Sequence, residues 1–232
     1  MDLALKHPVK KKATIRPRNS ATLVIVRFDG PVPRILMGQR HQDHAFMPNK
    51  FVFPGGRCET ADGRLPVAHE GDPITLEKLK LRMGTNPSHR RARGLLVAAI
   101  RETYEETGYL VGRPVVNAAP DLTGIVFFAR AITPPGRSRR FDSRFFVADA
   151  SILYNLDQPH RLEAEELLKV NWVTLAEAQA LNLPSITREI LLLLQPYISQ
   201  NSLPPVACAV SFWYSRGKTW RVEQLNLTFG VG

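Results

Sequence analysis

Residues 101 to 109 read Arg101-Glu102-Thr103-Tyr104-Glu105-Glu106-Thr107-Gly108-Tyr109. On a helix, positions 102, 105 and 106 are related by i, i+3 and i+4, so their three carboxylates project from one face of two adjacent turns. Like charges at this spacing repel one another, more strongly where they are partly buried. The cluster therefore predicts a compensating cation, and the natural candidate is a hard divalent ion with oxygen ligands, Mg²⁺ or Mn²⁺.

A second short segment, Phe53-Pro54-Gly55-Gly56, lies upstream of this cluster. Residues 51–53 read as a short strand that stops at the proline and the paired glycines. Glycine permits φ > 0 and a close approach of the backbone to a ligand, but an ordinary tight turn uses it equally well. Both interpretations of the glycines stay open from this segment alone.

The acidic stretch belongs to one long predicted helix. Ser88 is a suitable N-cap and Gly108 a suitable residue to end the helix in the left-handed conformation. Leu96, Ile100, Tyr104 and Thr107 are expected to form its core stripe. The opposite, functional face is expected to carry the three glutamates and Ala98, whose small side chain leaves room for a bound ligand.

The composition is that of an ordinary globular protein: 232 residues, 44% hydrophobic and 22% charged. No apolar run approaches the roughly 20 residues that span a bilayer. The two cysteines, Cys58 and Cys208, have no zinc-binding spacing around them. We therefore expect free thiols, in preference to a disulfide, and a cytoplasmic location.

The formal net charge of +10 suggests an anionic partner. That partner can be a phosphate-bearing small molecule, nucleic acid or an acidic surface. Basic residues are concentrated locally at 10–18, 78–93 and 137–144. Aromatic residues are not interleaved with them in the manner of an RNA-binding surface, so a purely solubilising role accounts for the charge at least as well as nucleic-acid binding.

The remaining elements follow from residue patterns and chain breakers. Residues 1–19 are basic and predict a mobile arm, preferred to a targeting peptide. Between residues 62 and 91 the chain is irregular and suggests an insertion with one short helix, Thr75 to Met83. The other predicted elements are strands at 21–28, 34–39, 124–132, 143–148 and 170–174, helices at 175–181 and 186–197, and a C-terminal hairpin of 206–214 with 219–225.

Taken together, these motifs resemble the box of the Nudix hydrolase family. That box reads Gly, five residues, Glu, seven residues, then Arg-Glu-aliphatic-x-Glu-Glu-x-Gly-aliphatic. The positions that match are Gly56, Arg101, Glu102, Glu105, Glu106 and Gly108. Where the family has the first Glu, this chain has Asp62, with Glu59 as another nearby carboxylate; Thr103 and Tyr109 stand at the aliphatic positions.

The box is interrupted. Between Asp62 and Arg101 lie 38 residues where the family has seven, so 31 are extra. This resembles a branch that includes animal CoA diphosphatases with a split box, although residues 41–56 lack the separate CoA signature. The deletion of part of 63–85 is expected to preserve folding and to alter substrate preference.

The resemblance implies a fold and a division of the chain. The fold is an α/β/α sandwich with a mixed sheet and an insertion within the box. The resemblance covers about residues 15–200, so the C-terminal β-hairpin is expected from its own residue pattern alone. The expected division is a basic arm at 1–15, a Nudix domain at 16–200 with an insertion at 63–90, and a hairpin extension at 201–232 packed on the same domain.

The resemblance also implies an activity: metal-dependent cleavage of a diphosphate linkage in a nucleoside diphosphate joined to another moiety, such as a CoA-like, ADP-ribose-like or dinucleotide substrate. Glu102, Glu105, Glu106 and the backbone of Gly56 are expected to bind Mg²⁺ or Mn²⁺, and Arg101 to orient a box carboxylate. Two further sets of residues have both a functional and a purely structural interpretation. The candidates for binding substrate phosphates, as alternatives to a solvated basic loop, are Arg137, Arg139, Arg140 and Arg144. The candidates for the general base, besides the box glutamates, are Glu163, Glu165 and Glu166, for which the alternative is a solvated acidic helix start.

Two other interpretations remain. One is a Nudix-shaped regulator that binds a nucleotide or nucleic acid without catalysis; the intact set of three glutamates favours the enzyme. The other is a helix with a solvated acidic face and no site. The expected partner is a small nucleotide-type diphosphate, with no membrane and no nucleic acid, and the chain is either a monomer or a homodimer.

Overall fold

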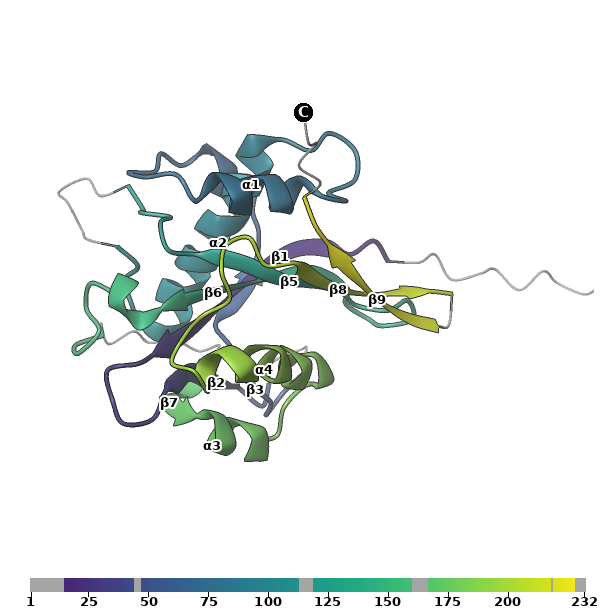
Figure 1. Cartoon of the computed structure of the whole chain (residues 1–232). Coiled ribbons are helices and arrows are strands. Elements are labelled where there is room, and N and C mark those ends of the chain that lie inside the picture. The colour runs from purple at the N-terminus through teal and green to yellow at the C-terminus, as the bar shows by residue number, and fades with distance from the viewer. Residues whose placement is uncertain (1–14, 44–46, 113–118, 160–166, 218, 228–232) are drawn as a thin grey trace, which may run out of the picture.

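The computed structural model describes residues 15–43, 47–112, 119–159, 167–217 and 219–227. They form three layers, with one mixed β-sheet between two pairs of helices (Figure 1). One face carries α1 (Pro73–Lys80) and α2 (His89–Thr107), and the other carries α3 (Leu175–Ala180) and α4 (Ser185–Ile198). The predicted α/β/α sandwich is therefore confirmed.

The sheet is built around β1 and follows the order β3-β2-β1-β6-β5-β8-β9. Its strands are β1 (Arg18–Arg27), β2 (Arg34–Arg40), β3 (Phe51–Val52), β4 (Gly55–Arg57), β5 (Val126–Ile132), β6 (Phe141–Asp149), β7 (Leu167–Thr174), β8 (Val210–Arg216) and β9 (Thr219–Leu225). The β1–β6 and β5–β8 pairs are parallel, and the other pairs are antiparallel. The sheet is thus mixed, as predicted.

Strand β1 contributes to both cores because its side chains alternate between the two faces. Ala21, Leu23 and Ile25 pack in the cluster that contains α2. Val24 and Val26 pack in the cluster that contains α4. A slip by one residue would exchange the two sets, so burial on both faces determines the register of this strand.

Helix α2 has the predicted ends. The Ser88 hydroxyl accepts a hydrogen bond from the Arg91 amide at 3.3 Å, and Gly108 ends the helix with φ of 75° in the left-handed region. The predicted division into a core stripe and a functional face is wrong for the middle of the helix. Residues 94–100 are buried on every side, and Ala98 is fully buried instead of leaving room for a ligand.

The insertion explains this burial because it covers the face of α2 that points away from the sheet. Its helix α1 begins at Asp72, whose side chain caps the Ile74 amide at 2.8 Å. Leu76 and Leu79 of α1 join the core cluster with Leu95 and Leu96 of α2. The expectation that the insertion can be deleted without harm to the fold therefore needs revision, because it supplies part of the core.

The start of the insertion lies against helix α2, the helix in which the insertion ends. The short 3₁₀ helix η1 (Asp62–Arg64) packs directly on α2 at Gly63 and Gly94. A Cβ added at Gly94 would lie 2.9 Å from the Gly63 amide nitrogen, so this close contact requires glycine. This contact brings the two halves of the box, which are separated in sequence, next to each other in the fold.

The predicted C-terminal hairpin is present as β8 and β9. Its residues pair in register from Val210 with Leu225 to Arg216 with Thr219. Strand β8 also pairs in parallel with β5, so the hairpin widens the central sheet at its edge (Figure 1). Val210, Phe212 and Leu225 of the hairpin are buried in the core on the α2 side.

Within the described residues, no helix is both long enough and apolar enough to cross a membrane.

We predict that Leu79→Ala destabilises the fold by about 2–5 kcal/mol, because it removes a side chain that is 1% exposed and leaves a cavity between α1 and α2. Urea unfolding of the full chain measures this change. The matched control is Leu65→Ala in the same insertion, where the side chain is 41% exposed and little change is expected. Equal effects of the two substitutions would contradict a core role for α1.

Candidate functional site

The carboxylates at the end of α2 lie against the backbone of β4. The Gly55 amide donates a hydrogen bond to Oε2 of Glu106 at 2.8 Å, in a buried position. A Cβ added at Gly56 would lie 2.3 Å from Oε2 of Glu102. Any side chain at position 56 would displace the Glu102 carboxylate, so the second glycine is needed for this close approach.

Arg101 connects the carboxylates to the other half of the box. Its guanidinium contacts Asp62 through Nε at 2.9 Å and through Nη2 at 3.2 Å. The same side chain donates through Nη1 to Glu102 at 3.0 Å and to Glu105 at 2.9 Å. Nη2 also donates to the Arg57 carbonyl at 2.9 Å. One side chain therefore holds β4, η1 and two of the three glutamates together.

These contacts strengthen the cationic form of Arg101. Burial disfavours its charge, but the hydrogen bond to Asp62 and the charges of Glu102, Asp62 and Glu105 outweigh burial and raise its pKa above the usual value. Asp62 is 1% exposed and also accepts the Glu59 amide at 2.7 Å. Asp62, which stands where the family has a glutamate, therefore uses both carboxylate oxygens to bind Arg101 and the loop before η1.

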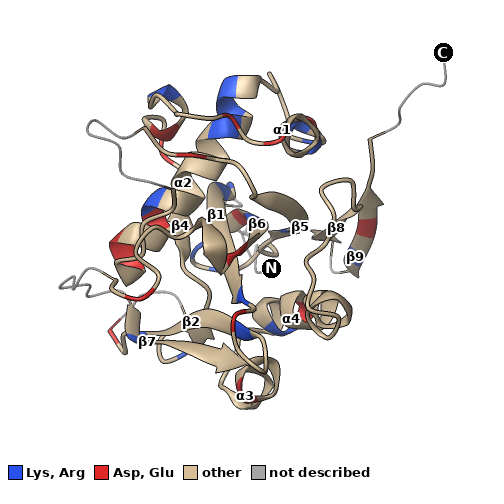
Figure 2. Cartoon of the chain, turned by 60° about the vertical axis from the view of Figure 1, so that its left-hand side comes forward, with Lys and Arg blue, Asp and Glu red and all other residues tan. Residues whose placement is uncertain are grey.

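The charges along α2 run against its dipole. Figure 2, in which the ribbon is coloured by residue type, shows basic residues on the first turns of the helix and acidic residues on the last turns. A helix N-terminus is partly positive and its C-terminus partly negative, so each misplaced charge costs about 0.3–1 kcal/mol at an exposed position. Helix stability therefore does not account for this arrangement. It is suited to binding a cation at the C-terminal end and an anion at the N-terminal end.

The oxygen atoms at the end of α2 and in β4 are suitable ligands for a hard cation. The carboxylates of Glu102 and Glu106 lie beside the Gly55–Gly56 backbone, and the Glu105 side chain is 52% exposed. Carboxylate and carbonyl oxygens are the ligands that Mg²⁺ and Mn²⁺ prefer. Among the described residues, no group of three or more His, Cys, Asp or Glu side chains is already gathered to hold a metal. A divalent ion would have to compete with Arg101 for Glu102 and Glu105.

The predicted arginine candidates fall into two different places. Arg139 and Arg140 line a pocket of about 370 Å³ together with Arg18 and Arg57. Arg57 follows Gly56 directly, so this pocket adjoins the strand that carries the glycines. Arg140 also has structural hydrogen bonds, to the Thr133 carbonyl at 2.9 Å and to the Ile15 carbonyl at 2.7 Å.

Arg144 lies elsewhere, inside the molecule. Its side chain is 1% exposed and forms an ion pair with Asp142 at 3.0 Å. It also donates to Asn19 Oδ1 at 2.9 Å. The structure therefore separates Arg144 from Arg139 and Arg140.

Several predicted features lie outside the described residues. They are the general-base candidates Glu163, Glu165 and Glu166, and residues 1–14 of the basic arm. Both cysteines are free thiols, and each is partly buried.

Two features of the site were not predicted. Strand β4, which presents the glycine backbone, was missed because Gly-Gly-Arg has little strand propensity and pairs with β1 only through long-range contacts. The contribution of Arg57 was missed for the same reason. The only signal in the sequence was its place immediately after the paired glycines.

Comparison with known proteins agrees with this fold. No protein-family model matches the sequence. A solved Nudix hydrolase from Alicyclobacillus acidocaldarius is 22% identical, with a TM-score of 0.60 over 82% of this chain and 99% of that one. The chain therefore has the fold of the Nudix hydrolases.

Two further solved structures match more weakly. A MutT Nudix hydrolase from Burkholderia pseudomallei is 18% identical, with a TM-score of 0.46 over 76% of this chain and 97% of that one. The Nudix domain of NrtR from Shewanella oneidensis, solved with ADP-ribose, is 13% identical, with a TM-score of 0.49 over 82% and 93%.

We predict that Asp62→Asn destabilises the protein by about 3 kcal/mol, because it leaves the partly buried Arg101 guanidinium without its two-point partner. The remaining contacts of Arg101 with Glu102 and Glu105 keep the loss toward the lower end of the range for broken buried pairs. Urea unfolding measures the effect. Asp157→Asn is the control, because that carboxylate is 83% exposed in its pair with Arg27 and its loss should be close to neutral.

Proposed function

We propose that this chain is a metal-dependent Nudix hydrolase that cleaves the diphosphate linkage of a nucleoside diphosphate joined to another moiety. The observation that carries the proposal is the position of Glu102 and Glu106 against the glycine backbone of β4, with Glu105 beside them. These residues stand at the box positions of the family whose fold the chain has.

In this proposal Glu102, Glu105 and Glu106 hold Mg²⁺ or Mn²⁺ together with the backbone of Gly56. When bound, the ion neutralises phosphate charge and stabilises the charge that develops during phosphoryl transfer. The donor chemistry supports the ion, and the dense negative charge at the C-terminal end of α2 gives it an electrostatic role.

The chain itself positions these ligands. The Gly55 amide fixes Oε2 of Glu106 at 2.8 Å. Arg101 restrains Glu102 and Glu105 and reduces the repulsion between them while the metal is absent. Arg101 binds Asp62 through Nε and Nη2. Its guanidinium can therefore stay in position when a glutamate exchanges its contact with Nη1 for a contact with the metal. Arg101 is therefore a positioning residue in this proposal.

The pocket that contains Arg139 and Arg140 is proposed to receive substrate phosphate. Four arginines line it, counting Arg18 and Arg57, and a guanidinium is well suited to phosphate oxygens. The general base is proposed to be a box glutamate or one of Glu163, Glu165 and Glu166. CoA-like, ADP-ribose-like and dinucleotide substrates all contain the linkage that this site would cleave.

We predict that Glu105→Gln and Glu106→Gln each lower kcat by a factor on the order of 10² or more, because each removes a charged metal ligand. Folding should be preserved, since the amide oxygen of the glutamine introduced in Glu106→Gln can still accept the Gly55 hydrogen bond and repulsion in the cluster falls. The assay follows AMP or phosphate release from ADP-ribose, NADH, CoA and dinucleoside polyphosphates with Mg²⁺ or Mn²⁺ added.

The matched control for these variants is Glu189→Gln, which removes an exposed carboxylate from α4 on the opposite face of the sheet. Its activity should equal that of the unmodified chain, and EDTA should abolish hydrolysis in both. Near-normal metal-dependent hydrolysis in both box variants would exclude the proposed site.

We also predict that Arg139→Gln raises KM on the order of tenfold with a smaller effect on kcat, because one charge-assisted contact to phosphate is lost. Steady-state kinetics with the best substrate of the screen measure this. Arg137→Gln on the same loop is the control, since Arg137 does not line the pocket of Arg139. If the two variants have the same KM, Arg139 does not bind substrate.

A further inference from the structure

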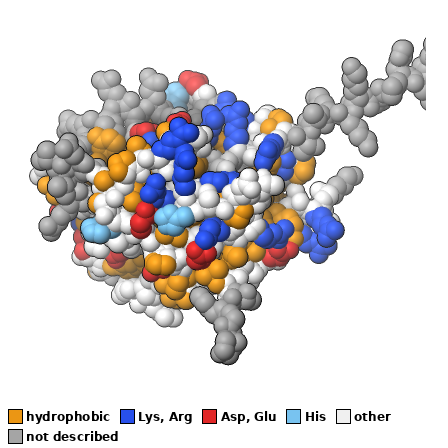
Figure 3. Space-filling view, turned by 90° about the horizontal axis from the view of Figure 1, so that it is seen from above, with side chains coloured by type: hydrophobic (Ala, Val, Ile, Leu, Met, Phe, Trp, Pro, Cys, Tyr) orange, Lys and Arg blue, Asp and Glu red, His pale blue; other side chains and the backbone are white. Residues whose placement is uncertain are grey.

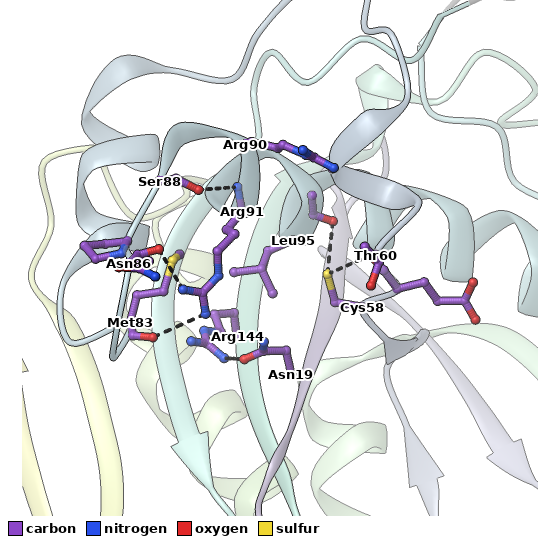
Figure 4. Close-up of a pocket in the computed structure, with 14 residues that line it drawn as sticks. Asn19, Cys58, Thr60, Met83, Asn86, Ser88, Arg90, Arg91, Leu95 and Arg144 are labelled. Atoms are coloured by element: carbon purple, nitrogen blue, oxygen red, sulfur yellow. Dashed lines mark hydrogen bonds between the residues drawn. The ribbon is translucent and has the colours of Figure 1, made fainter.

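A second pocket, of about 620 Å³, lies beside the N-terminal half of α2 (Figure 4). We call it the insertion pocket, because the insertion forms one of its walls through Met83, Asn86 and Pro87. The segment 58–60 forms the facing wall, and Asn19 of β1 and Arg144 of β6 contribute from the sheet. Glu102, Glu105 and Glu106 do not line it, so it is a separate place from the carboxylate cluster.

Arg144 brings a buried positive charge to this pocket. Its carboxylate partner, Asp142, is shared with Arg130, which binds both Asp142 oxygens at 2.8 Å. The Nε atom of Arg144 is buried and has no hydrogen-bond partner among the described residues. Two buried guanidinium groups thus share one carboxylate, and a buried donor of Arg144 is left without an acceptor among the described residues. The positive charge around Arg144 is therefore only partly compensated.

The other side of the pocket adds further positive charge. Arg91 donates to the Thr85 carbonyl at 2.7 Å and to the Asn86 carbonyl at 2.8 Å. Figure 4 shows the Arg91 and Arg144 side chains pointing toward each other from α2 and β6. Within the described part of the chain, neither Arg90 nor Arg91 forms an ion pair with a carboxylate, and Glu59 is the one acid among the lining residues. Figure 3, which views the molecule from above the orientation of Figure 1, shows several basic side chains close together on that surface.

The ionisation of the neighbouring groups agrees with an excess of positive charge. Burial, together with the charges of Arg130 and Arg91, lowers the pKa of Arg144 to about 10 against the opposing effect of Asp142. Burial also raises the pKa of the Cys58 thiol to about 11, so Cys58 adds no negative charge at neutral pH. An anion in the pocket would compensate the arginines.

The pocket also has an apolar side. Met83 is 7% exposed and Leu95 is 3% exposed, and both line it. Cys58 also lines the pocket and packs against the core cluster that contains Leu95. A ligand that matches this lining has an anionic group for the arginines and an apolar body for the remaining wall.

We propose that the insertion pocket binds a phosphate-bearing small molecule with an apolar body. The binding would occur beside the carboxylate cluster and without its metal. The loop from Arg57 to Asp62 connects the two places, because Arg101 bonds to both ends of the loop while Cys58, Glu59 and Thr60 line the pocket. The proposal does not depend on hydrolysis by the chain.

The test is isothermal titration calorimetry of the full chain with phenyl phosphate in the presence of EDTA, which removes metal-dependent binding at the carboxylates. Saturable binding is expected, weaker with inorganic phosphate because the ring is absent. Arg144→Gln should weaken the binding of phenyl phosphate on the order of tenfold. Arg90→Gln should also weaken it, and because Arg90 is exposed, that variant tests the pocket even if loss of Arg144 disturbs folding.

The matched control is Arg137→Gln, which removes an arginine that lines neither pocket. Unchanged affinity in this variant, with weaker binding in Arg90→Gln, supports the proposal, and Arg139→Gln reports on the other basic pocket. No saturable binding, equal affinity for phenyl phosphate and inorganic phosphate, or a loss of affinity confined to Arg139→Gln would overturn it. Hydrolysis is measured separately with Mg²⁺, so binding without hydrolysis would contradict the proposed function and leave this inference standing.

Discussion

The bidentate ion pair between Arg101 and Asp62 is the contact on which the rest of the site depends. It joins residues 39 positions apart and closes the point at which the insertion leaves and re-enters the box. Because the same guanidinium holds Glu102, Glu105 and the Arg57 carbonyl, the interruption does not separate the halves of the box in space. An insertion is tolerated at this position because its ends are fixed by this partly buried ion pair and by the tight packing of Gly63 on Gly94.

The charges along α2 oppose its local stability. Its N-terminal turns are basic and its last turns acidic, against the helix dipole. Tertiary packing compensates, because residues 94–100 are buried between the sheet and the insertion. The helix therefore carries two regions of opposite charge, one beside the glycine backbone of β4 and one beside the insertion pocket.

Strand β1 determines where these regions lie. Along one edge it pairs with β4 near its beginning and with β2 near its end, while β6 pairs along the other edge. Strand β4 thereby lies under the last turns of α2, where only glycine allows the Glu102 carboxylate so close. On the α2 side of the sheet, Asn19 and Arg144 lie under the first turns of the helix and form part of the insertion pocket.

The sequence by itself determined the elements that local rules control. Ser88 and Gly108 bound the long helix, the i, i+3, i+4 spacing puts the glutamates together, and strand periodicity with chain breakers predicts most of the sheet. Tertiary structure decided the rest. Long-range contacts alone pair β4 with β1 and form the ion pair between Asp62 and Arg101. They also bury Arg144 away from Arg139 and make the insertion part of the core. In each case a buried charge or an apolar face is stabilised by a residue far away in the sequence. Secondary-structure propensity and residue spacing describe only neighbouring residues, so they cannot identify that contact.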